Sequence, residues 1–287
     1  MRKLIKLNQS FILWIAIYPV VLCTPSHHIP AIEIQARENV QFFLEKKCCV
    51  ARGDVCLKQG ETQIVCQKIE IFFKDSVIHK VPEIHHIIAT GNVVMRRGSS
   101  ELKADDFIFY VDTQTFVAQS YSPTNVKFFQ HDRQVSVQAQ QIRYHLSTQK
   151  GIAKGCTRLT HAKGWLQSEE IFFVFSHTPS QSFNSVFPID SLNKKGKLLA
   201  HAKGNVLVVY EDWKSSSKEA FYDQILDRIW LTGSVHAAKG TETFGITQNA
   251  ILDLKKNCYR VKSSPACVSV LRIPVGQGIS FKHRKRK

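Results

Sequence analysis

The feature that most constrains this fold is a short repeat that occurs five times along the chain. Each copy reads small or apolar residue, any residue, Gly, any residue, strand-forming residue. Self-similarity of this kind in β-type sequence indicates stacked supersecondary units, so function should lie in a surface or groove that the stack creates. The copies are Ala51–Val55, Ala89–Val93, Ala153–Thr157, Ala202–Val206 and Leu231–Val235.

Each copy continues into a turn and a second strand. A second glycine follows at Gly60, Gly98, Gly164 and Gly240, where tolerance of positive φ suits a tight hairpin turn. The strand after it places apolar residues alternately and carries a small residue at positions 66, 104, 139, 168, 217 and 247. A step of three after the small residue changes the alternation, so we expect a bulge or bend there.

This pattern predicts an all-β fold built from apolar-in, polar-out hairpins. We expect a curved antiparallel sheet of about 14–16 strands with an apolar concave face. One domain should span 27–280, with possible sub-blocks 27–175 and 198–280 around a loop at 176–197 that is rich in Ser, Pro and Asn. A tightly packed, dry sandwich core is the competing reading of the same periodicity.

The two ends of the chain carry basic residues. Arg2, Lys3 and Lys6 precede an apolar run, 11–22, that is too short to span a bilayer comfortably, so 1–26 reads as a secretory signal peptide. Cleavage after Cys23 or after Ser26 fits, and retention as a membrane anchor is the alternative. The tail at 281–287 is also basic, and the formal net charge of the full sequence is +16. In an exported protein this charge favours an anionic lipid head group over nucleic acid.

No catalytic or metal-binding motif is present. The pairs His85-His86 and Asp105-Asp106 should point to opposite faces of a strand, so neither predicts a metal site or a pair of catalytic acids. We therefore expect no enzyme activity, no metal and no cofactor. A polysaccharide-acting enzyme that uses Asp105, Asp106 and Glu169 as acids is the least favoured alternative.

The chain has eight cysteines and no C-x-x-C. Cys258 and Cys267 could pair across a hairpin in an oxidising compartment. Cys56 and Cys66 flank the Gly60 turn, but the strand register puts them on opposite faces, so we expect no bridge between them.

Four segments together resemble the OstA-like (LptA) family of periplasmic lipopolysaccharide-transport proteins. Ile32-Glu33-Ile34-Gln35-Ala36 is similar to the first strand of that family, and Gly53–Gly60 to its Gly-Asn-Val hairpin. Ile64–Ile69 resembles its Ile-x-Ala-Asp-Lys-Val strand, with Cys66 in place of Ala, and Leu231–Val235 resembles its Leu-Thr-Gly-Asn-Ala. The resemblance covers roughly 31–260, with the loop at 176–197 as a departure.

The resemblance implies a twisted, V-shaped β-jellyroll with an apolar trough. It implies a non-catalytic carrier in the periplasm of a Gram-negative cell, which holds the acyl chains of lipopolysaccharide and passes them from the inner to the outer membrane. Partners would be lipopolysaccharide and the inner- and outer-membrane components of the transport system, joined by edge-strand addition, with possible head-to-tail self-association. A structural or adhesive β-solenoid, or the membrane-anchored member of the same system, are the alternatives.

The candidate lipid-binding residues come from two sources. Two of them match first-strand positions of the family, and the others occupy inward positions of the repeat. Burial of one acyl methylene is worth only about 0.8 kcal/mol, so binding must be distributed over many side chains. The candidates are Ile32, Ile34, Val55, Leu57, Ile64, Val93, Met95, Leu102, Phe107, Phe109, Val137, Ile142, Tyr144, Leu166, Ile171 and Phe173.

Overall fold

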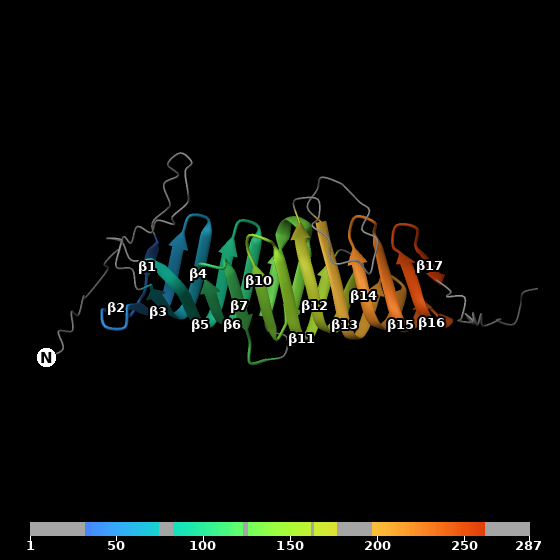
Figure 1. Ribbon diagram of the computed structural model, residues 1–287, viewed down its shortest axis with the longest axis horizontal. Helices are drawn as coiled ribbons and strands as arrows, with labels where there is room; N and C mark the ends of the chain where they lie inside the picture. The colour runs from blue at the N-terminus through green and yellow to red at the C-terminus, as the bar shows by residue number, and fades with distance from the viewer. Residues whose placement is uncertain (1–31, 75–82, 123–125, 162–163, 177–196, 262–287) are drawn as a thin grey trace, which may run out of the picture.

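The structure, a computed structural model, describes residues 32–74, 83–122, 126–161, 164–176 and 197–261. Antiparallel pairing joins 17 strands into one sheet. The strands lie side by side along the long axis of the molecule, with β1 and β2 at one end and β17 at the other (Figure 1). The predicted all-β class is confirmed, and the strand number is slightly above the expected range.

The strands of the N-terminal part are β1 Glu33–Gln35, β2 Asn39–Phe43, β3 Cys48–Gln59, β4 Thr62–Phe73, β5 Ile84–Arg97, β6 Ser100–Tyr110, β7 Thr115–Gln119, β8 Val126–Gln130 and β9 Val135–Ala139. A 3-10 turn, His131–Arg133, separates β8 from β9. The remaining strands are β10 Gln141–His145, β11 Lys150–His161, β12 Gly164–Ser176, β13 Lys197–Tyr210, β14 Trp213–Asp223, β15 Arg228–Lys239, β16 Glu242–Asp253 and β17 Cys258–Val261.

The glycine of each repeat marks a bulge in the middle of a long strand. In β5, Gly91 has a φ of 81° and Asn92 a φ of 49°, and the register with β6 shifts between Thr90 and Val93. Two consecutive left-handed residues turn the strand sharply, which only Gly followed by a short side chain does at small cost. The same pair occurs at Gly53-Asp54, Gly155-Cys156, Gly204-Asn205 and Gly233-Ser234.

These bulges fold the single sheet along a line into two facing parts. We call sheet A the part that contains β2, β7, β10 and β17, and sheet B the part that contains β1, β8 and β9. Each long strand gives one half to each: Cys48–Arg52 of β3 pairs with β2, whereas Cys56–Lys58 pairs with β1. The chain also passes from A to B between β7 and β8, and returns at Gln140 between β9 and β10.

The small residue of the second strand lies beside each of the five glycine bulges, at positions 66, 104, 168, 217 and 247. At four of these positions the side chain closes the bend by a hydrogen bond to the carbonyl two residues later. Ser168 Oγ donates to the Glu170 carbonyl at 2.8 Å and Ser217 Oγ to the Glu219 carbonyl at 2.9 Å. Thr247 and the Cys66 thiol make the same contact at 3.2 Å. The extra residue lies on the glycine strand rather than on this one.

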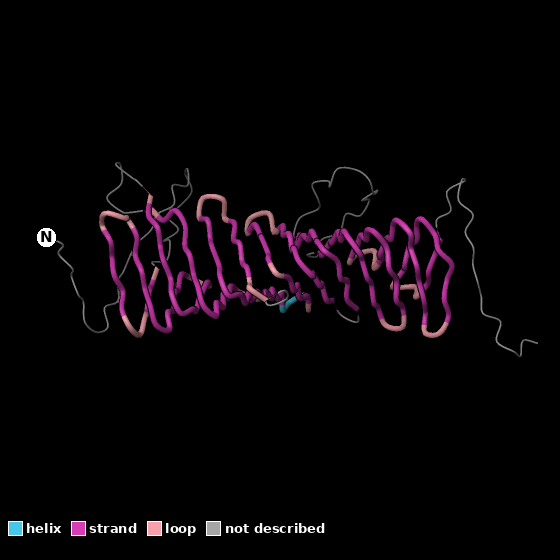
Figure 2. The backbone as a smooth tube through the Cα atoms, turned by 90° about the horizontal axis from the view of Figure 1, so that it is seen from below, coloured by secondary structure: helices cyan, strands magenta, loops and turns pink. Residues whose placement is uncertain are grey.

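The cross-section is therefore a V. Backbone joins the two sheets along the line of bulges, and along the opposite long edge the turns of A and B face each other without covalent linkage (Figure 2). We call this second edge the open edge. The interior side chains increase in size from the bend to the open edge. Next to the bend lie the alanines at 51, 89, 118, 153, 202, 220 and 250, and further out lie Phe109, Tyr144, Phe175 and Tyr222.

The outer face of sheet A departs from the expected polar-out pattern. Inward and outward residues alternate along each strand, and on these strands the outward residues are also often β-branched or aromatic. As a result, one row of cross-strand partners on the outer face is mostly apolar. Phe221 in this row is only 7% exposed and packs against Trp230 in a tilted arrangement, with the ring centroids 5.6 Å apart. The row includes Ile88, Ile108, Val117, Ile152, Phe172, Phe221, Trp230 and Ile251.

Several predictions fall on residues outside the described ranges. These are the signal peptide 1–26, nearly all of the loop at 176–197, the tail 281–287 and the partner Cys267 of the possible bridge. Among the helices in the described ranges, none has the length and apolar character needed to cross a membrane. The division into sub-blocks 27–175 and 198–280 stays a prediction.

Candidate functional site

The candidate lipid-binding side chains all face the interior of the V. Sheet A contributes Phe107, Phe109, Ile142, Tyr144, Ile171 and Phe173. Sheet B contributes Ile34, Val55, Leu57, Ile64, Val93, Met95, Leu102, Val137 and Leu166, and Ile32 is buried just before β1. The inward assignment of these residues is thus correct, whereas their role in lipid binding stays a prediction.

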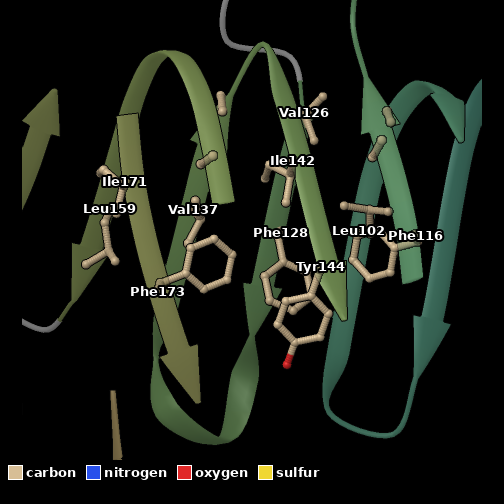
Figure 3. Close-up of a cluster of buried hydrophobic side chains, with 14 of the residues drawn as sticks. Leu102, Phe116, Val126, Phe128, Val137, Ile142, Tyr144, Leu159, Ile171 and Phe173 are labelled. Atoms are coloured by element: carbon tan, nitrogen blue, oxygen red, sulfur yellow. The ribbon is translucent and has the colours of Figure 1, made fainter. Parts of the chain in front are cut away.

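The interior is filled by contacts between the two sheets. Phe128 of sheet B is the centre of an aromatic cluster, 5.2 Å from Tyr144 and 5.9 Å from Phe175 between ring centroids. Phe116 and Phe173, also from sheet A, lie 6.3 Å from the same ring. Figure 3 shows Phe128, Tyr144 and Phe173 close to one another, with the Tyr144 hydroxyl pointing away from the cluster. Aromatic packing of this kind joins the arms of the V.

The expected open trough is therefore not seen between the described strands. Every candidate residue is at most 6% exposed, except Phe109, which is partly buried beside the core. The physical reason is that water would otherwise cover a long apolar furrow, at a cost of about 25 cal/mol for each Å². The sheets instead close on each other, and a ligand would have to replace contacts that the protein makes with itself.

Basic residues of sheet B lie beside the aromatic cluster at the open edge. The Arg133 guanidinium lies 5.3 Å from the centroid of the Phe175 ring on sheet A, and its side chain is 7% exposed. Burial raises the pKa of Tyr144 to about 12, and the nearby charges of Arg133 and Arg97 oppose this rise. The Tyr144 phenol stays protonated at any physiological pH, so its hydroxyl is available as a hydrogen-bond donor beside two cations.

A second contact across the open edge is a hydrogen-bonded trio. His161 at the end of β11 belongs to sheet B, and its Nδ1 lies 2.8 Å from the Tyr222 hydroxyl of sheet A. Its Nε2 lies 3.1 Å from Nε2 of Gln224, in the turn that follows β14. Gln224 Oε1 accepts the backbone N–H of Leu198 at 2.9 Å, which fixes the amide with its NH₂ group towards His161.

This orientation sets the protonation state of the histidine. Since the Gln224 NH₂ group donates, His161 Nε2 must accept, and the proton of the neutral ring is then on Nδ1, which donates to the Tyr222 oxygen. Burial lowers the pKa of His161, with a smaller opposing effect from Asp227. A proton on Nε2 would face the amide donor, so the trio needs neutral histidine. We call this trio the His161 clasp.

A third contact spans the open edge near the C-terminal end of the described sheet. Trp213 of sheet B is 3% exposed and donates its Nε1–H to Asn257 Oδ1, in the turn after β16, at 2.5 Å. The Trp213 ring stacks on Tyr259 of sheet A at 5.8 Å, and Lys239 Nζ lies 5.2 Å from the Trp213 centroid.

Two hollows adjoin these sheets. A small apolar cavity of about 30 Å³ lies directly behind the His161 clasp, between the arms of the V. Its walls come from both sheets and include Leu159, Leu166, Val208, Tyr222, Ile229 and Leu254. A larger hollow of about 520 Å³ lies on the outer face of sheet A, where Arg143, His145 and Lys150 surround Phe172.

One prediction about the polar pairs is wrong. His85 and His86 do not point to opposite faces, because the β4–β5 register shifts beside them, and their Nδ1 atoms lie 2.7 Å apart. Burial, and then the charge of His85, lowers the pKa of His86. In the described part of the chain no group of three or more His, Cys, Asp or Glu side chains is placed to hold a metal ion.

The carboxylates that were considered as candidate acids accept hydrogen bonds at places where the chain changes direction. Asp105 Oδ2 accepts the Ser120 hydroxyl at 2.5 Å and the Tyr121 N–H at 3.1 Å, and Asp106 Oδ2 accepts the Tyr121 hydroxyl at 2.7 Å. These bonds fix the segment in which the chain leaves sheet A after β7. Glu169 accepts from Asn205 Nδ2 at 2.6 Å, beside the bulge of β13. Each carboxylate therefore has a structural role.

The cysteine side chains follow the predicted register. Cys66 is buried in the interior and Cys56 is half-buried on the outer face, and both are free thiols. Burial raises the pKa of Cys66 to about 12 and, with a smaller effect from Cys48, that of Cys49 to about 11. These thiols stay protonated and are poor nucleophiles.

Sequence reasoning missed several residues at the open edge. Phe116, Phe175 and Tyr222 are buried interior aromatics. Phe116 lies in a strand without the signature, Tyr222 lies in a weak copy, and Phe175 lies two residues beyond the copy in β12. An alternation of apolar residues, Phe116 with Ala118 and Phe173 with Phe175, was the available signal. The polar contacts of His161 and Gln224 had none, because they join residues 63 positions apart in the chain.

The family model described as "LptA/(LptD N-terminal domain) LPS transport protein" matches residues 80–175, which include β5 to β12 and the aromatic cluster. About a third of the chain is thus similar to this family. The resemblance stated from the sequence is confirmed for this segment, although the motifs that suggested it lie outside the matched residues. Proteins of this family are not enzymes, in agreement with the expectation from the motifs.

Among solved structures, the chain is similar to LptH, described as the LptA-homologous periplasmic component of the lipopolysaccharide transport device from Pseudomonas aeruginosa. The two share 15% sequence identity with a TM-score of 0.34, and the match covers 40% of this chain and 75% of LptH. No curated protein is significantly similar to the chain.

Proposed function

We propose that this protein takes part in lipopolysaccharide transport and binds the acyl chains of lipopolysaccharide between the arms of the V. The observation that carries the proposal is an apolar interior whose two walls are joined by backbone along one edge and by side-chain contacts alone along the other. That construction allows the walls to part without breaking the sheet. The LptA/LptD N-terminal domain at 80–175 supports the same function.

We further propose that the protein is a periplasmic bridge, with lipid passing along the interior from one end of the sheet to the other. The edge strands support this. At the N-terminal end of the described sheet, Phe42 is 46% exposed and Leu44 79% exposed beside β2. At the other end β17 extends sheet A beyond sheet B, and Ile246 on β16 is 59% exposed. Such edges are templates for strand addition by a membrane component or a second copy.

A photo-crosslinking amino acid at Phe109 tests the acyl-chain site. This residue is inward, partly exposed and close to the open edge, so we expect it to capture lipopolysaccharide in cells. Ile108 is the matched control, because it is the next residue of the same strand and lies in the outer row. Equal labelling from both positions, or labelling from Ile108 alone, would place the lipid on the outer surface and overturn the proposal.

A dry-core structural protein is the second candidate, and the packed interior favours it. The two functions differ in what a ligand does. A fatty acid should raise the midpoint of thermal unfolding of a carrier, because it binds the folded state alone, and should leave a sealed core unchanged.

A further inference from the structure

At the His161 clasp, polar groups hold the two arms together beside a small apolar cavity. His161 from sheet B contacts Tyr222 and Gln224 from sheet A, and the small cavity lies directly behind them. The His161 ring and the Tyr222 side chain themselves form part of its wall.

We propose that the His161 clasp is the point at which an acyl chain enters the interior, and that the clasp must open to admit it. This inference rests on the proposed function. The cavity between Leu159, Leu166, Val208 and Ile229 would receive the first methylenes of the chain, since its lining is mostly apolar. The ligand class is a linear acyl chain attached to a head group that stays in solvent.

The chemistry of the clasp suits a part that opens. An interior closed by apolar packing alone regains nothing from water when it parts, because every Å² exposed is a cost. The groups of the clasp are different: His161, Tyr222 and Gln224 exchange their mutual hydrogen bonds for bonds to water, so the net loss for each bond is only about 0.5–1.5 kcal/mol. The open edge is therefore easier to separate here than at the Phe128 cluster.

The neighbouring turn gives the clasp a firm anchor on one side. Gln224 N–H donates to the Leu198 carbonyl at 3.1 Å, and Leu198 N–H donates to Gln224 Oε1. Asp223 Oδ1 accepts from the N–H groups of Ile225 and Leu226, at 2.8 and 3.2 Å. The sheet A side is thus fixed by hydrogen bonds to backbone groups, so opening is a movement of the His161 end of β11 away from a stationary Gln224.

The test is the uptake of a conjugated polyene fatty acid, whose fluorescence rises in apolar surroundings, by the full chain. Tyr222→Phe and Gln224→Ala each remove one clasp hydrogen bond. A larger open fraction raises the association rate and the apparent affinity together, by roughly two- to tenfold for one net hydrogen bond. Tyr110→Phe and Gln141→Ala make the same chemical changes on the outer face of sheet A and should leave both quantities unchanged.

The outcomes separate the two proposals. Faster and tighter uptake in both clasp variants, with unchanged controls, supports the clasp as the access point. Wild-type uptake rates in both clasp variants, with the probe still bound, overturn the clasp and leave the acyl-chain site standing. No fluorescence rise with any protein, wild type included, overturns the acyl-chain function itself. If Tyr222→Phe fails to fold, Gln224→Ala decides, because Gln224 lies in a turn outside the core.

Discussion

Replacement of Phe128 by Ala measures how much the contact between the two sheets contributes to stability. Phe128 is 2% exposed, and the rings of Phe116, Tyr144, Phe173 and Phe175 lie between 5.2 and 6.3 Å from it. All four belong to sheet A, so truncation leaves a cavity between the arms rather than within one sheet.

The expected loss follows from these contacts. A buried Phe→Ala change costs about 3–5 kcal/mol, and the higher values belong to sites that collapse little. Four large partners anchored in long strands cannot follow the lost ring, so we expect about 4–5 kcal/mol here. Phe129 is the matched control: it is the next residue of β8, lies on the outer face of sheet B and stacks on His131 at 6.1 Å. Phe129→Ala should cost below about 1 kcal/mol.

Urea unfolding followed by circular dichroism gives both free energies. Equal losses for Phe128→Ala and Phe129→Ala would refute the assignment of inward and outward faces in sheet B. A loss below about 2 kcal/mol at Phe128 would refute the closed V, since a ring in an open trough loses little packing on truncation. In the carrier reading, a saturating fatty acid should also restore more stability to Phe128→Ala than to wild type, because the chain fills the new cavity.

Three further predictions concern the bulge, the clasp and the thiols. Gly98→Ala should destabilise the protein by roughly 1–2 kcal/mol, the cost of a left-handed alanine, because a Cβ at 98 finds no atom closer than 3.8 Å. Gly91→Ala should destabilise it by clearly more, because a Cβ at 91 also meets the Gln67 side chain. Thermal unfolding of both variants checks this. The folded state holds the pKa of His161 below its ordinary value of 6.5, so the unfolded chain binds the proton more readily and His161 should contribute stability above about pH 6.5 that is lost as the pH falls through its lowered pKa. His161→Gln should flatten that part of the pH–stability curve measured by thermal unfolding, and an unchanged curve would exclude the clasp as its source. A maleimide should label exposed Cys156 in the native protein and reach Cys49 and Cys66 only after unfolding; rapid native labelling of Cys66 would contradict its interior position.

The repeat was sufficient to predict which residues face inward. Alternation in a strand and the change of alternation at the bend are local properties, so Val55, Ile64 and Phe107 could be assigned without any knowledge of the sheet order. The bend itself was predicted on the second strand, whereas the extra residue lies at Gly91-Asn92 and its equivalents. A glycine signals freedom of φ but does not say whether a turn or a bulge uses it.

The closure of the V was beyond local reasoning. Phe128 meets Tyr144 and Phe175 because strands distant in sequence face each other, and nothing in the periodicity of either strand distinguishes an open trough from a filled one. The same limit applies to the outer row of sheet A, where Phe172 and Phe221 reverse the expected polarity. These strands are apolar on both faces. Such a pattern predicts a buried strand but does not tell which of its two faces lies in the interior.

A closed interior is what an apolar carrier should have when it is empty. An open furrow lined by Leu57, Met95 and Phe173 would be an exposed apolar surface and an aggregation site, so the arms close on the smallest volume that their side chains allow. An acyl chain then competes with the protein's own contacts, and its net gain for each methylene is below the roughly 0.8 kcal/mol of simple burial. In the proposed carrier, weak and distributed binding of this kind would let a lipid move along the interior, because no single position would hold it strongly. The side chains taper from Ala153 at the bend to Tyr144 and Phe175 at the open edge, so a lipid that enters from the open edge would displace the large side chains first.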